Sequence, residues 1–67
     1  MIRLELNGEP RDIPENLTVS GLLAYLDLTG QPLLIEQNGV ALFKYEWAEK
    51  PVNAGDKIEL IRVVAGG

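Results

Sequence analysis

The residues with the most distinctive chemistry are the last three, Ala65-Gly66-Gly67, which follow a run of large apolar side chains. The run from Ile58 to Val64 is rich in β-branched residues, which favour a buried strand. Two terminal glycines have neither the side chain nor the conformational preference to continue a sheet. A backbone without Cβ atoms can also enter a narrow channel in a partner. We therefore hypothesise that a strand presents a flexible tail whose C-terminal carboxylate is the reactive group.

A terminal Gly-Gly has a second interpretation, because chain ends fray and can carry residues left by cloning. The pair here follows the strand directly, without a linker or tag sequence before it. This position favours the chemical interpretation. We divide the chain into a folded domain, residues 1–64, and a flexible C-terminal Gly-Gly tail, residues 65–67.

Composition excludes several classes of function. Without cysteine or histidine, the chain lacks the usual nucleophile and base pairs and the ligands of tight zinc sites. Ten acidic and six basic residues give a net charge of −4, the wrong sign for binding nucleic acid or an anionic membrane. No apolar run approaches the ~18 to 20 residues that span a bilayer, and no signal peptide is evident. At 67 residues, we expect one small cytoplasmic domain with a stability on the order of 3 to 10 kcal/mol.

Two hairpins and one helix are predicted to position the last strand. Residues 2–6 alternate as a half-buried strand, and Asn7-Gly8 turns the chain into a short return strand over about 11–13, with Pro10 favouring a sheet edge. Thr18 caps a helix that Gly30 is placed to end. Residues 33–37 form a strand, and Asn38-Gly39 returns the chain as 40–42. Trp47 anchors a short helical turn within 44–50.

This element order predicts an α+β fold with one mixed sheet of about five strands and one main helix on one face. The last strand is the most apolar, so we place it in the middle of the sheet, beside the first. The predicted core consists of the apolar residues on the inward faces of these elements: Ile2, Leu4, Leu6, Ile13, Val19, Leu22, Leu23, Leu26, Leu33, Ile35, Leu42, Val52, Ile58 and Leu60.

Four motifs together resemble the ThiS family, the sulfur carriers of thiamin thiazole biosynthesis. They are Gln37-Asn38-Gly39-Val40, Glu46-Trp47-Ala48, Ala54-Gly55-Asp56-Lys57-Ile58 and the terminal Val64-Ala65-Gly66-Gly67. The likeness covers essentially the whole chain and implies a β-grasp, ubiquitin-like fold. Many relatives carry Pro-Arg after the second hairpin, where Phe43-Lys44 stand here.

The resemblance also implies a mechanism. A carboxylate is ionised at neutral pH and is a poor electrophile, so it needs activation. In the family, a ThiF-type adenylyltransferase that uses ATP and Mg adenylates the C-terminal glycine, and sulfur from a persulfide then gives a thiocarboxylate, which ThiG thiazole synthase receives. Gly67 would carry the sulfur, Gly66 and Ala65 would give access to the tail, and the catalysts would belong to the partners. The carrier itself would be neither an enzyme nor the holder of a cofactor or metal.

A carrier must also dock to its partners. Ile61 and Val63 have the opposite parity to the core residues of the last strand, so they would lie on the sheet face away from the helix. With Phe43 they could form an apolar docking patch, or the segment 44–50 could simply cover them. Arg62 shares the parity of the core and must reach the rim, where it could pair with an acidic partner groove or only with Glu59 or a neighbour in this chain.

Three functional hypotheses remain open from the sequence. The first is the sulfur carrier for thiazole synthesis. The second keeps the carrier chemistry with another acceptor: molybdopterin synthesis, tRNA thiolation or a ubiquitin-like modification of lysines. The third is an interaction module in which the Gly-Gly is incidental. The Glu46-Trp47 turn favours the first hypothesis.

Overall fold

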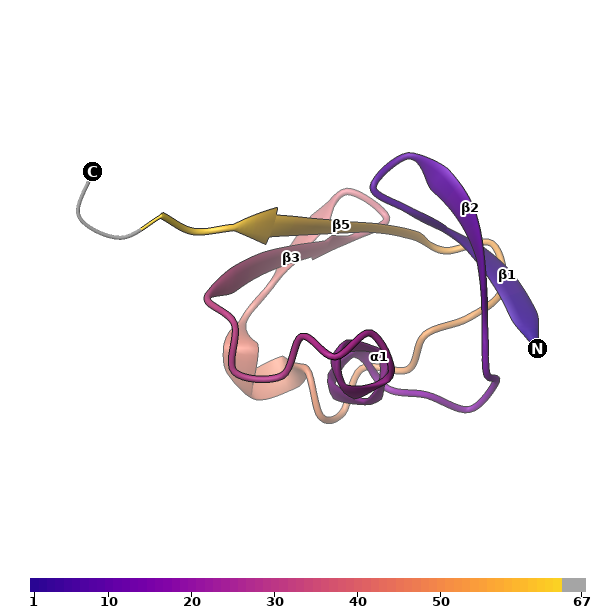
Figure 1. Cartoon of the computed structure of the whole chain (residues 1–67), viewed down its shortest axis with the longest axis horizontal. Coiled ribbons are helices and arrows are strands. Elements are labelled where there is room, and N and C mark those ends of the chain that lie inside the picture. The colour runs from indigo at the N-terminus through magenta and orange to yellow at the C-terminus, as the bar shows by residue number, and fades with distance from the viewer. Residues whose placement is uncertain (65–67) are drawn as a thin grey trace.

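The computed structural model describes residues 1–64, which form one sheet with a helix packed on one face (Figure 1). The strands are β1 (Ile2–Leu6), β2 (Glu9–Ile13), β3 (Leu33–Gln37), β4 (Val40–Leu42) and β5 (Lys57–Arg62). The helix α1 spans Val19–Tyr25, and a 3₁₀ turn, η1, spans Lys44–Glu46. The prediction of an α+β fold with a mixed five-stranded sheet and one main helix is confirmed.

The strand order is β2-β1-β5-β3-β4, so β5 lies in the middle of the sheet beside β1, as predicted. The pairing of β1 with β5 is parallel, and the other three pairings are antiparallel. Both hairpins turn through an Asn-Gly pair with positive φ at each residue, which is the geometry of the tight turn that matches strand twist. Pro10 lies in the edge strand β2, where its missing N–H leaves the sheet intact.

Helix α1 begins as predicted but ends earlier. The Thr18 side chain accepts a hydrogen bond from the Gly21 N–H at 3.1 Å and caps the first turn. Asp27, not Gly30, ends the helix: Asp27 has a φ of 59°, and the Leu28 N–H reaches back to the Leu23 carbonyl at 2.8 Å. These contacts form a Schellman motif. An aspartate can adopt this left-handed conformation because its short polar side chain can hydrogen-bond locally. The prediction assumed that a glycine would take this conformation, and it therefore placed the helix end at Gly30.

Two predicted strand boundaries were also wrong. The return strand β2 begins at Glu9 rather than near Arg11, because an edge strand tolerates Pro10 within it. The last strand β5 ends at Arg62 rather than at Val64. Arg62 pairs with Leu33, the first residue of the antiparallel strand β3. A residue after Arg62 therefore has no residue of β3 opposite it.

The core lies between the sheet and α1. The buried residues are Leu4, Ile13, Val19, Leu22, Leu23, Ile35, Trp47, Val52 and Ile58. Every other residue of the predicted core packs partly buried against this cluster, and the unpredicted Leu17 and Leu28 do so as well. Trp47 anchors η1 as expected, and its carbonyl accepts a hydrogen bond from the Ser20 N–H of α1 at 3.0 Å.

One buried carboxylate joins the second hairpin to the turn before β5. Asp56 is 8% exposed, and its two oxygens accept hydrogen bonds from Gln37 Nε2 at 2.9 Å, Asn38 Nδ2 at 3.1 Å and the Asn53 N–H at 2.8 Å. Burial by itself raises the pKa of Asp56. The hydrogen bonds from Asn53, Asn38 and Gln37 together lower this pKa by more than burial raises it, so that it lies below its ordinary value. The carboxylate is therefore held in its ionised form.

Replacing this carboxylate should make the protein's stability less dependent on pH. Asp56→Asn should lower the free energy of unfolding by about 1 to 3 kcal/mol near neutral pH, because an amide nitrogen would face donors that now meet an oxygen. Since the folded-state pKa is depressed, the contribution of Asp56 is present above the unfolded pKa of about 3.9 and is lost as the pH falls through the folded pKa. Denaturant unfolding of both proteins at several pH values checks this. A difference that stays constant from neutral to acidic pH would contradict it.

Candidate functional site

The central strand β5 carries the chain toward its C-terminus and away from the side on which the N-terminus lies (Figure 1). The Val63 N–H donates to the Pro32 carbonyl at 2.9 Å, so the backbone is still held to the body one residue after the strand ends. Val64 is the last residue that the structure describes, and its side chain is exposed. Ala65, Gly66 and Gly67, the residues predicted to reach a partner and carry sulfur, lie outside the described residues.

Apolar side chains gather on the sheet face away from α1, next to the end of β5. Ile61 pairs with Leu34 of β3 in the sheet register. Ile61 is 45% exposed and Val63 is 41% exposed, so other residues of the described chain cover neither of them fully. Leu34 is also exposed and was missed from the sequence, because its proximity to Ile61 depends on the register of two strands far apart in the chain.

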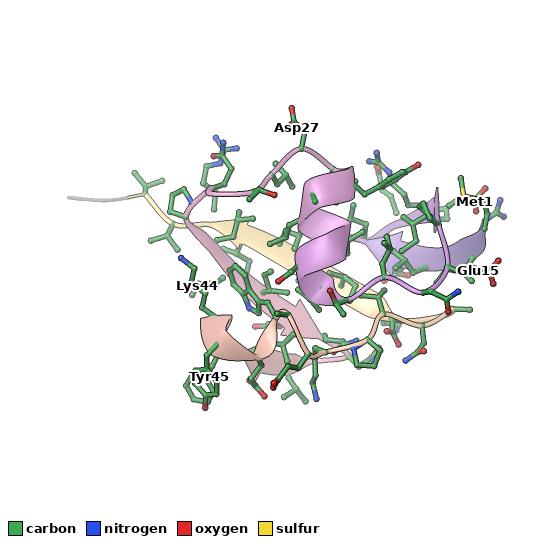
Figure 2. The ribbon with its side chains drawn as sticks, turned by 90° about the horizontal axis from the view of Figure 1, so that it is seen from below. Met1, Glu15, Asp27, Lys44 and Tyr45 are labelled. Carbon is green, nitrogen blue, oxygen red and sulfur yellow. The ribbon has the colours of Figure 1, made fainter. Side chains whose placement is uncertain are left out.

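Phe43 extends this row across β3. Ile35 pairs with Leu42 at the end of β4, and continuing this register by one residue would set Phe43 next to Leu34. The Glu46 side chain accepts a hydrogen bond from the Phe43 N–H at 2.8 Å and holds this backbone in place. The Tyr45 ring stacks on Phe43 with centroids 5.3 Å apart, and Figure 2 shows Tyr45 projecting from the body. We define the outer apolar patch as Leu34, Phe43, Tyr45, Ile61 and Val63.

The alternative that residues 44–50 cover Ile61 and Val63 is wrong. Trp47 and Lys50 of this segment pack on the helix side: the Lys50 carbonyl accepts a hydrogen bond from the Val19 N–H at 2.9 Å, and Trp47 enters the core. The structure therefore leaves the side chains of Phe43, Ile61 and Val63 exposed.

Arg62 lies on the opposite face, toward the helix side, and its side chain is exposed at the rim. Among residues 1–64 the ion pairs are those of Met1 with Glu15 and of Arg3 with Asp12, so Arg62 makes no pair with Glu59 there. In the second pair, a 2.8 Å hydrogen bond from the Arg3 guanidinium lowers the pKa of the Asp12 carboxyl. Within residues 1–64, Arg62 therefore has no ion-pair partner, and its side chain is free to bind a group on another molecule.

Two kinds of feature are relevant among residues 1–64: clusters of metal-binding side chains and membrane-spanning helices. Residues 1–64 contain no group of three or more His, Cys, Asp or Glu side chains that could hold a metal ion. No helix in this range is both long enough and apolar enough to cross a membrane.

A single mixed sheet with a central parallel pair, one covering helix and a central strand that leads into a C-terminal Ala-Gly-Gly define a ubiquitin-like β-grasp domain. The chain belongs to the ThiS family, whose model matches residues 4–67. The fold is that of the crystal structure of a thiamine biosynthesis protein, ThiS, from Geobacter metallireducens. The TM-score is 0.86 at 29% identity, over 98% of this chain and all of that one.

Curated relatives agree with this assignment. The chain is 33% identical, over 98% of its length, to a thiazole synthase from Paramagnetospirillum magneticum, and it spans only 20% of that protein. It is 36% identical, over 98% of its length, to the uncharacterized protein ycf40 of Porphyra purpurea and spans 93% of it. A domain like this one therefore occurs both by itself and within a longer protein named as a thiazole synthase.

Proposed function

We propose that this chain is the sulfur carrier for the thiazole moiety of thiamin and that Gly67 bears the sulfur as a thiocarboxylate. The observation that carries the proposal is that, in a ThiS-family domain, the sequence Ala65-Gly66-Gly67 follows two residues after the end of the central strand β5. The relatives named as thiazole synthases favour thiazole as the acceptor over molybdopterin or tRNA.

Loading takes place in two steps on partner enzymes. In the first, a Gly67 carboxylate oxygen bonds to the α-phosphorus of ATP, and pyrophosphate leaves. In the second, a persulfide sulfur attacks the acyl carbon and AMP leaves, after which a thiol cleaves the sulfur–sulfur bond and frees the thiocarboxylate. Adenylation is needed because the ionised carboxylate resists nucleophilic attack. Gly66 and Ala65 let the tail enter narrow active sites because they add little bulk to the backbone.

The chemistry is assigned to the partners rather than to this chain. A ThiF-type adenylyltransferase holds ATP and Mg, a persulfide donor supplies sulfur, and ThiG thiazole synthase receives it. The carrier has no histidine or cysteine with which to assist these steps. We therefore regard it as a co-substrate and not as an enzyme. Because loading consumes ATP, we place the carrier in the cytoplasm.

The outer apolar patch provides the contact that loading requires. Its side chains flank the end of β5, so a partner that covers them would lie where the tail enters its active site. Exposed apolar and aromatic groups of this kind are the residues that dominate binding energy at protein interfaces. Phe43 with the stacked Tyr45 supplies the aromatic part, and Ile61 with Val63 supplies the aliphatic part.

Intact mass spectrometry tests this proposal. The chain is incubated with a ThiF-type enzyme, ATP, Mg and a persulfide donor, and a parallel reaction omits ATP. We expect an ATP-dependent gain equal to the replacement of one oxygen atom by sulfur, located in the C-terminal peptide. An unchanged mass under conditions that load a known carrier would reject the carrier function and leave the interaction-module hypothesis.

A further inference from the structure

A groove lies on the helix side of the sheet, where β5 ends. Its volume is about 340 Å³, and it opens between the β1–β2 hairpin, the end of β5 and the turn that follows α1. Five half-buried leucines line it: Leu6, Leu26, Leu28, Leu33 and Leu60. The groove is on the opposite face of β5 from the outer apolar patch, and it is not part of the surface assigned above.

The position of the groove follows from where β1 stops. Beyond Leu6 the chain turns away into the hairpin, and the Asn7 side chain accepts the Leu60 N–H at 2.7 Å in place of a strand neighbour. The Asn7 N–H donates to the Ile58 carbonyl at 2.9 Å, which fixes the hairpin against β5. The last residues of β5 therefore have no β1 strand beside them, and the side chains of Leu60 and Arg62 border open space.

The charge of the groove is opposite to the charge of the whole chain. Arg11 of β2 and Arg62 of β5 line it, and no aspartate or glutamate does. Both arginines are exposed, and neither is in an ion pair among residues 1–64. In a chain with ten acidic and six basic residues, this is a local concentration of positive charge above an apolar floor.

These features select the kind of occupant. A long polyanion such as a nucleic acid would be repelled by the net charge of −4 on the rest of the chain. Its phosphates would also make no favourable apolar contact with the leucines that line the groove. A short acidic protein segment in the groove would interact electrostatically mainly with the two arginines, because charges farther away than about 8 Å are screened at physiological salt. An apolar side chain between its carboxylates would cover the leucines. Arginine also pairs with carboxylates through two parallel hydrogen bonds, which favours this geometry.

We propose that this groove docks an acidic segment of thiazole synthase, with an apolar side chain of that segment on the leucine floor and carboxylates on Arg11 and Arg62. The assignment to thiazole synthase rests on the proposed function and on the relatives in which a domain like this one is part of a thiazole synthase. The partner would then hold β5 from the helix side near the point where the tail leaves the domain.

Calorimetric binding of this chain to the purified thiazole synthase of the same organism tests the proposal. The double variant Arg11→Glu/Arg62→Glu should bind about tenfold more weakly or worse at low salt, and the difference from the unmodified chain should shrink at high salt. Arg11→Gln/Arg62→Gln should give a smaller loss. Lys50→Glu is the matched control, because Lys50 is exposed and lies outside the groove, and it should change the affinity by less than about twofold.

Equal weakening by Lys50→Glu, unchanged binding by both arginine variants, or no binding by the unmodified chain would overturn the proposal. Binding of a single-stranded oligonucleotide that depends on the arginines, with unchanged binding to thiazole synthase, would also overturn it. Thermal melting of each variant establishes that it is folded. Failure of the groove is distinct from failure of the carrier function, because sulfur loading by the activating enzyme is measured separately and without thiazole synthase.

Discussion

Deleting Gly67 should slow sulfur loading by at least about 100-fold without changing the free energy of unfolding. The shortened chain still ends in a glycine, Gly66, but its carboxylate is retracted by about 3.3 to 3.6 Å, the length of one extended residue. A misplacement of about 1 Å from the reactive geometry can already cost roughly 100-fold in rate. Stability should be unaffected because the last described backbone bond to the body is at Val63. Intact mass against time gives the rate, and denaturant unfolding gives the stability.

The control for this deletion is a substitution far from the tail. Glu9→Gln changes an exposed side chain at the start of the edge strand β2 and should load at the rate of the unmodified chain. If the chain that lacks Gly67 gains sulfur as fast as the control, the reactive group is misassigned. If it loads slowly but also unfolds at lower denaturant, the last residue has a structural role that we do not expect.

Ile58→Ala should lower the free energy of unfolding by about 2 to 5 kcal/mol, the usual cost of emptying a buried isoleucine site. Ile58 is 1% exposed and lies in the central strand, opposite Leu6 of β1 and Gln37 of β3. For a domain of this size, whose stability is on the order of 3 to 10 kcal/mol, this is a large fraction of the total. The melting temperature should fall by roughly 10 °C or more. Circular dichroism during heating measures it.

Ile61→Ala is the matched control for this prediction, since it makes the same change in the same strand. Ile61 is 45% exposed on the outer apolar patch, so its replacement should cost less than about 1 kcal/mol of stability. It should instead raise the KM of the activating enzyme for the carrier by about 5- to 30-fold if the patch is the docking surface. Similar losses of stability for the two variants would contradict the assignment of opposite faces.

Much of this protein can be predicted from local sequence because short-range geometry determines it. Each Asn-Gly pair specifies a tight hairpin, since both residues accept positive φ. Thr18 begins α1 through a bond to a residue three positions away. Alternation of apolar residues indicates which side chains are buried, and the predicted core agrees with the observed one. The end of α1 escaped prediction because Asp27, rather than a glycine, takes the left-handed conformation.

The group proposed to carry sulfur was likewise inferred from sequence, because the Ala65-Gly66-Gly67 motif is read without any knowledge of the fold. The surfaces proposed to dock partners could not be inferred in this way. Leu34 becomes a neighbour of Ile61 only through the pairing of β3 with β5. Arg11 and Arg62, which are 51 positions apart, line one groove only because β1 ends early beside β5. Spacing along the chain carries no information about such contacts, since strand register across long separations is set by how the whole core packs.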